Sequence, residues 1–258
     1  MNFTGAELMS WLSALLWPFM RISAMFVAAP FFSARSLPVR IRVVLAFLVA
    51  FLVAPVIPEP PSVDLISGEA LVISISQVII GTAMGFILQM VFAAFIIGGQ
   101  SIATAMGLGF ASIVDPQNGV QVPVVSQVYL IMATLVFLAL NGHLVFIDVM
   151  AKSFLNMPIG PVFPSSDGLW QLVIWGSDMF TGGMLIALPA VTALLLVNLA
   201  FGVTSRAAPQ LNIFAVGFPI MILVGIVFII LTLPTITAHL SNLLADALDL
   251  IHSHLLVM

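Results

Sequence analysis

The stretch Gly98–Gln127, GGQSIATAMGLGFASIVDPQNGVQVPVVSQ, separates two long apolar runs. It contains five glycines, two prolines and four glutamines, and its Asp115–Gly119 portion has the composition of a turn. These residues disfavour a regular helix over the middle of the stretch, so we predict an irregular, Gly-rich central loop over residues 98–127. Irregular backbone at membrane depth is tolerated only where protein buries it or water reaches it, because each unpaired backbone group costs several kcal/mol. The central loop is therefore a candidate gate.

The composition is that of an integral membrane protein. Of the 258 residues, 62% are hydrophobic and 6% are charged, whereas soluble domains carry about 25% charged residues. The formal net charge of -4, with six lysines and arginines, excludes a basic nucleic-acid-binding surface. Glu7 precedes the first apolar run and the basic segment of a signal peptide is missing, so we expect the sequence to begin at the mature N-terminus.

Side chains that carry out chemistry are few and scattered. The chain has no cysteine, four histidines and ten aspartates and glutamates. No apolar run contains a His-x-x-x-His pattern or a carboxylate pair, which would suit a metal or acid–base site on a helix. We therefore expect no enzyme activity, no catalytic residue, no metal and no cofactor. For the same reason we interpret the polar turn Asn141–His143 as a helix boundary and not as part of a metal site.

Six apolar runs predict an all-α membrane protein of about six long hydrophobic helices arranged in hairpins. Runs of about 20 residues are long enough to cross a bilayer, and only the second run is clearly shorter. In the third run, Gly81 and Gly85 form a Gly-x-x-x-Gly pair, which lets a second helix approach closely. Ser166 or Asp167 is expected to cap the fifth run. The runs cover residues 8–32, 43–57, 71–97, 124–147, 169–203 and 213–233, and an acidic amphipathic helix follows them.

Two charges, Arg21 and Asp178, lie inside these runs. An arginine at the centre of a spanning helix costs about 2.5 to 3.5 kcal/mol on insertion scales, so we expect Arg21 to face an aqueous path, a carboxylate or a partner subunit. The alternative is that its long side chain reaches the membrane boundary. In a simple spanning model the basic loop residues lie mainly on one side, which we interpret as cytoplasmic. That side holds Arg35, Arg40, Arg42 and Arg206, and the other holds Lys152.

The segment Ser205–Ile220, SRAAPQLNIFAVGFPI, resembles the FliR/SpaR-type export-gate family of type III secretion. Asp115-Pro116, Asn141-Gly142-His143 and Ser153-Phe154 fit the same family pattern, and the resemblance covers essentially the whole chain. It favours the flagellar branch, and the gate subunit of a virulence-type system is the alternative. Within the segment, the resemblance is carried by Arg206, Pro209, Gln210, Leu211, Asn212, Gly217 and Pro219.

The resemblance implies one membrane export-gate domain over residues 1–258, in the bacterial inner membrane at the flagellar basal body. Residues 1–165, with the central loop 98–127, would correspond to a FliP-like part. Residues 166–258 would form a FliQ-like helical hairpin with an amphipathic tail. The implied partners are FliP-like and FliQ-like subunits, FlhB-like and FlhA-like export proteins, unfolded flagellar proteins as cargo, and membrane lipid.

Composition and resemblance together predict a pore plug within the central loop. Glycine allows unusual backbone conformations and a small footprint, while methionine and other apolar side chains can form a deformable seal. The alternative is a packed re-entrant loop that only fills the assembly. The predicted plug residues are Met106, Gly107, Gly109, Phe110, Ile113, Asp115, Pro116 and Asn118.

A second predicted site is a subunit-contact turn formed by Arg206, Pro209, Gln210 and Asn212, for which an ordinary helical hairpin turn is the alternative. Two other functions compete with the export gate. A small secondary transporter also uses Gly-rich loops between broken helices, but this chain has few buried ionisable residues and no persuasive internal repeat. A membrane scaffold without a conduit of its own is the third candidate.

Overall fold

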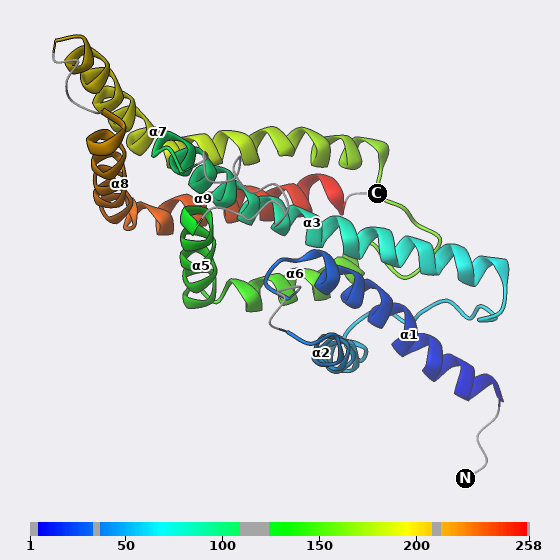
Figure 1. Ribbon diagram of the computed structural model, residues 1–258. Helices are drawn as coiled ribbons and strands as arrows, with labels where there is room; N and C mark the ends of the chain where they lie inside the picture. The colour runs from blue at the N-terminus through cyan, green and yellow to red at the C-terminus, as the bar shows by residue number, and fades with distance from the viewer. Residues whose placement is uncertain (1–4, 33–36, 109–123, 208–212, 257–258) are drawn as a thin grey trace. The chain divides into compact units, whose positions relative to one another are not determined.

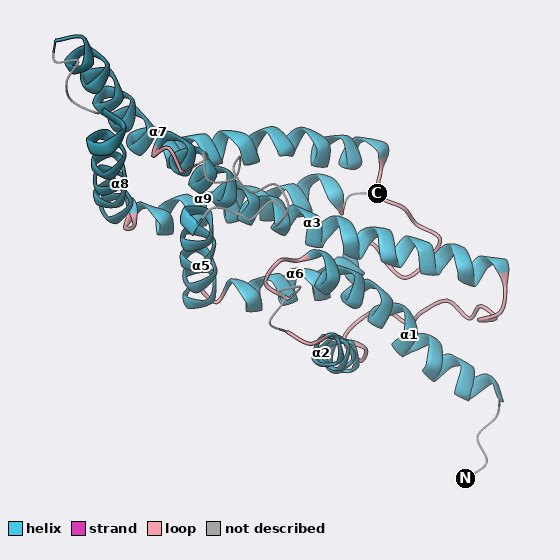
Figure 2. Cartoon of the chain, in the orientation of Figure 1, coloured by secondary structure: helices cyan, strands magenta, loops and turns pink. Residues whose placement is uncertain are grey.

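The described part of the chain is helical. The computed structural model describes residues 5–32, 37–108, 124–207 and 213–256, and within these residues no strand occurs (Figure 2). This confirms the all-α fold predicted for a membrane protein. In chain order the helices are α1 Gly5–Ala28, α2 Val39–Val53, α3 Gly68–Ala105, α5 Val124–Ala139, α6 Gly142–Asn156, α7 Ser166–Ala207, α8 Ile213–Thr232 and α9 Thr235–Leu250, followed by the π-helical turn η2 Ile251–Leu255 (Figure 1).

By length and composition, three helices in the described residues can cross a membrane, at Trp11–Ala28, Gly68–Ala105 and Ser166–Arg206. Two broken helix pairs raise the number to as many as five, if each pair is one span. Helix α2 has 15 residues, about 22 Å of helix, and is shorter than the hydrocarbon core of roughly 30 Å. The structure therefore does not support six simple membrane crossings. The prediction that the basic loops lie on the cytoplasmic side depended on six crossings, and it stays a prediction.

The central stretch contains more helix than its glycines indicated. Helix α3 continues through Gly98 and Gly99 to Ala105, and α5 begins at Val124, so the prediction of irregular structure is wrong at both edges of the stretch. The two glycines do not break the helix because they face neighbouring helices, where the missing side chain permits close packing. Residues 109–123, the middle of the predicted loop, lie outside the described residues.

Two other boundaries depend on single side chains. The apolar run 124–147 is two helices, because Asn141 adopts the left-handed conformation with a φ of 56° between α5 and α6. Asparagine tolerates this conformation better than most residues, and the polar turn expected here is confirmed. Helix α7 is capped by Ser165, whose Oγ accepts a hydrogen bond from the Gly168 amide at 3.0 Å, and not by either of the two residues expected.

Contacts divide the chain into two compact units, each built from segments that are far apart in the sequence. The predicted division of the chain at residue 166 concerns likeness to other subunits and stays a prediction. The first unit contains Met1–Met90, Leu140–Trp175 and Leu244–Met258, and the second contains Val91–Ala139 and Gly176–Leu243.

In the first unit, α1 packs closely on the N-terminal half of α3 (Figure 1). A Cβ built on Gly81 would lie 2.1 Å from the backbone oxygen of Arg21, and a Cβ on Gly85 would lie 2.6 Å from that of Met25. Both distances are shorter than any real Cβ contact, so only glycine fits at these positions. The close helix packing predicted for the Gly-x-x-x-Gly pair is confirmed.

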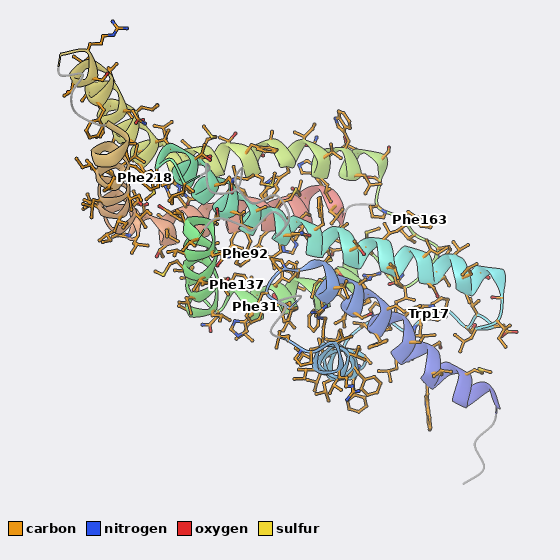
Figure 3. All side chains as sticks on the ribbon, viewed as in Figure 1. Trp17, Phe31, Phe92, Phe137, Phe163 and Phe218 are labelled. Atoms are coloured by element: carbon orange, nitrogen blue, oxygen red, sulfur yellow. The ribbon has the colours of Figure 1, made fainter. Side chains whose placement is uncertain are left out.

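In the second unit, the C-terminal part of α3 packs against α5 and α7. Phe92 of α3 and Phe137 of α5 meet edge to face with ring centroids 5.5 Å apart (Figure 3). A Cβ on Gly98 would lie 3.0 Å from the backbone oxygen of Gly183, and a Cβ on Gly183 would lie 2.8 Å from that of Ala94. Glycines on both helices therefore bring the backbones of α3 and α7 together.

Candidate functional site

The predicted plug begins at the C-terminal end of α3, which lies within the described residues. The helix ends in a Schellman motif, in which the Gly107 amide donates to the Thr104 oxygen and the Leu108 amide to the Ala103 oxygen, both at 3.0 Å. Gly107 has a φ of +82°, in the left-handed region where a Cβ would introduce strain. A glycine thus stands where the chain leaves the helix.

Met106 precedes this turn and is buried, with 2% of its surface exposed. A Cβ on Gly107 would lie 3.5 Å from two ring atoms of Phe218, a residue of α8 in the same unit (Figure 3). Met106 and Gly107 are the two predicted plug residues that the structure describes. The other six, Gly109, Phe110, Ile113, Asp115, Pro116 and Asn118, lie outside the described residues, so the plug stays a prediction.

The beginning of α5, on the other side of residues 109–123, packs against the same helix. The Ser126 hydroxyl donates to the Ile96 carbonyl oxygen at 3.1 Å, and a Cβ on Gly99 would lie 2.5 Å from the Ser126 Cα. Gly99 and Met106 are seven residues apart on α3, about 10 Å along its axis. The two ends that flank residues 109–123 are therefore both fixed close to the last two turns of α3.

Arg21 forms a second polar site, within the first unit. Its side chain is fully buried, and its three nitrogens donate to the Gln77 Oε1 at 2.8 Å, the Ser153 Oγ at 3.1 Å and the Met157 carbonyl oxygen at 3.0 Å. The guanidinium carbon lies 4.1 Å from the centroid of the Phe154 ring, a cation–π distance. This one side chain joins α1, α3 and the C-terminal end of α6.

This environment differs from each that was predicted for Arg21. Its three acceptors are an amide, a hydroxyl and a carbonyl, which are all uncharged and belong to the same chain. Among the described residues, neutral dipoles and an aromatic face surround the charge. Only the family resemblance points to Ser153 and Phe154, because nothing in the sequence relates them to a residue of α1.

Asp178, the second charge predicted to lie inside an apolar run, is exposed on α7. The hydrogen bonds of Arg21 do not include it, so the two charges are separate features. Its helix also exposes large apolar side chains on both sides of it, among them Val173 and Phe180. Asp178 is therefore not part of a buried site among the described residues.

Arg206 is exposed in the last turn of α7, where a positive charge is favourable because the C-terminal end of a helix carries partial negative charge. Pro209, Gln210 and Asn212 lie outside the described residues, so the subunit-contact turn stays a prediction. Helix α9 is amphipathic as expected, since Leu240, Ala247 and the following Ile251 are buried while its aspartates are exposed.

Known proteins resemble this chain over nearly its full length. A family model described as bacterial export proteins, family 1, matches residues 12–247. The flagellar biosynthetic protein FliR of Escherichia coli (strain K12) is 37% identical over 97% of this chain and 96% of its own length. The proteins of the same name from Pectobacterium carotovorum and Bacillus subtilis (strain 168) are 38% and 33% identical, over 97% and 92% of this chain and 96% and 92% of their own lengths. Because the family model matches most of the chain and these relatives are 33% to 38% identical to it over nearly its full length, the chain belongs to family 1 of the bacterial export proteins, the family of the flagellar biosynthetic protein FliR.

Proposed function

We propose that this chain is a core subunit of the flagellar type III export gate in the bacterial inner membrane. It helps to form and close the conduit through which unfolded flagellar proteins cross. The proposal is supported by membership of an export family, by relatives named for flagellar biosynthesis, and by several helices that can cross a membrane. In this proposal residues 1–165 take a FliP-like place and residues 166–258 a FliQ-like place among the subunits.

The observation that carries the proposal is the surface of α7. In an 18-residue apolar window of the candidate span Ser166–Arg206, 22% of the residues are buried inside the chain, against 61% in such a window of the span Gly68–Ala105. A transporter that works alone would turn its apolar helices toward lipid and enclose a polar substrate site. Helix α7 instead carries an exposed carboxylate, Asp178, among its exposed apolar side chains, which fits burial against further subunits.

Co-expression with FliP-like and FliQ-like subunits tests this function. We expect gentle extraction to yield one stable hetero-oligomer, and native mass spectrometry to find a single copy of this chain in it. FlhB-like and FlhA-like proteins are expected to join the larger apparatus. A monomer or homodimer that ignores these partners, and that transports a solute in vesicles, would contradict the proposal and favour a secondary transporter.

The plug proposal has its own test. Deletion of residues 107–118 removes Gly107 and the chain beyond it, and leaves all of α3 and Met106 in place. We expect an assembled complex with this deletion to let small solutes leak across the inner membrane. If the assembled complex stays impermeable, residues 107–118 only fill space within the assembly.

The turn after α7 is proposed to contact a neighbouring gate subunit through Arg206. Arg206→Ala should reduce the amount of partner that co-purifies, since the exposed charge lies at the end of the helix. Arg40→Ala, which removes an exposed charge at the start of α2, is the matched control. Normal assembly and normal export with Arg206→Ala would leave this turn as a simple helix connection.

A further inference from the structure

The two ends that flank residues 109–123 are held by contacts of different kinds. At the α5 end the contact is between backbones, since a Cβ on Gly99 would meet the Cα and N of Ser126 at 2.5 and 2.9 Å. At the α3 end the Met106 side chain enters a notch, which is the space beside Gly225 of α8. A Cβ on Gly225 would meet the Cγ, Sδ and Cε of Met106 at 2.5, 2.6 and 2.6 Å.

The notch belongs to the buried stripe of α8. Met221, one turn before Gly225, is 5% exposed, while Leu223 is 64% exposed on another side of the helix. Because Gly225 has no side chain, the Met106 side chain occupies the space where one would lie. The end of α3 thus contacts α8 through the flexible Met106 side chain, and the neighbouring Gly107 lies close to the Phe218 ring.

We propose that Met106 and Gly225 form a releasable seat that positions the end of α3 on α8, while the Ser126 end stays fixed. Methionine is unbranched, so it can leave the notch by rotating its own bonds. Gly107, next along the chain, permits the change of backbone direction that such a release requires. Ser126 cannot leave Gly99 unless the two helix backbones separate and its hydrogen bond to α3 breaks.

Gly225 is thereby a positioning residue of the gate. The seat controls the conduit only if the central stretch, residues 98–127, contains the plug proposed above. The seat holds Met106 and the Gly107 turn against α8 in the closed state. During export this end of α3 leaves α8, and the α5 end does not move. The two kinds of contact make these two ends experimentally separable.

The first test fills the notch. Gly225→Ala places a methyl group inside the space of Met106, so the side chain must move out. In the assembled complex we expect solute leak to rise by roughly tenfold, because an overfilled helix contact shifts a two-state equilibrium by about this factor. Gly68→Ala is the matched control, since nothing lies within 4 Å of a Cβ at that position and it lies at the start of α3, outside the proposed contact surface of α7. A Gly225→Ala complex as impermeable as the control would overturn the seat.

A covalent tether tests the seat even if Gly225→Ala fails to assemble. The chain has no cysteine, so Met106→Cys with Gly225→Cys introduces a single pair. The Cβ built on Gly225 lies within 2.6 Å of the Met106 side chain, which puts the two sulfurs within reach of each other. Oxidation should stop export of flagellar subunits and keep the membrane impermeable, and a reductant should restore export. Loss of maleimide labelling measures how much of the pair is cross-linked.

A second tether serves as the control. A Cβ on Gly98 would lie 3.3 Å from the Ile186 Cβ, close to the mean disulfide separation of about 3.8 Å. Gly98→Cys with Ile186→Cys therefore links α3 to α7 in the same unit. We expect this tether to leave export unchanged. Export that continues through the 106–225 tether, or that stops equally with both tethers, would overturn the inference.

These outcomes separate the seat from the proposed function. If the reduced cysteine variants do not restore export to cells that lack the native chain, although wild-type sequence does, the variants have damaged the gate. If wild-type sequence also fails to restore export, the export function itself is wrong. If deletion of residues 107–118 causes leak but neither Gly225→Ala nor the 106–225 tether has an effect, the plug is correct and the seat is wrong.

Discussion

Arg21 shows how neutral partners among the described residues accommodate a buried charge. A guanidinium group has five N–H donors in a fixed plane, so it can bind several acceptors and stack on a ring at once. Here it binds Gln77, Ser153 and the Met157 carbonyl and lies over Phe154. A lysine ammonium is a compact point charge and cannot reproduce this planar arrangement.

Arg21→Lys is therefore expected to destabilise the protein although the charge is retained. The buried charge would lose most of its partners, which costs about 3 kcal/mol of unfolding free energy. The purified complex should melt several degrees lower, as followed by the fluorescence of its tryptophans. Arg40→Lys, at an exposed position, is the control and should leave the melting temperature unchanged. Equal melting of the two variants would mean that the network around Arg21 contributes little to stability.

At the scale of the helix, glycine positions decide which backbones touch. Gly81→Ala would place a methyl group 2.1 Å from the Arg21 carbonyl oxygen, so α1 and α3 would have to move apart. We expect a loss of about 3 kcal/mol, the upper part of the range for overfilled contacts, because the opposing atom is backbone and cannot rotate away. Gly68→Ala on the same helix has nothing within 4 Å and should be neutral. Protein yield and melting temperature measure both, and a stable Gly81→Ala variant would contradict this packing.

The same glycines explain how much of the fold the sequence predicts. Apolar runs predict that helices form, and the spacing of Gly81 and Gly85 predicts a close helix contact, because both depend on local pattern. The partner helix is not predictable in this way, since it depends on residues far apart in the sequence. The prediction of irregular structure at Gly98 and Gly99 is wrong for this reason, because the helices that they pack against are far from them in the sequence. Nothing in the local sequence marks Gly225 as a contact position.

At the scale of the whole molecule, the chain leaves many large apolar side chains exposed. Helix α8 exposes Leu223, Ile230 and Leu231, and α7 exposes Leu195 and others. Apolar surface of this extent must be covered by lipid or by other proteins. Exposed apolar residues alone do not distinguish the two, because both environments accept them. A charged group among them does, since hydrocarbon does not stabilise a carboxylate.

Asp178 is the group that distinguishes lipid from protein. If α7 faces lipid there, the carboxylate is a liability, and Asp178→Asn should leave assembly unchanged or improve it. If a partner subunit covers it, a donor or cation of that subunit must face it, and the variant should reduce the recovery of intact complex on the order of tenfold. We expect the second result, with a salt dependence that the variant abolishes. Asp148→Asn is the control, because Asp148 is exposed and pairs with Lys152 at 2.7 Å on its own helix, where such pairs contribute little. Equal recovery of the two variants by native mass spectrometry would place Asp178 outside the subunit contacts, and the polar surface of α7 would then need another explanation.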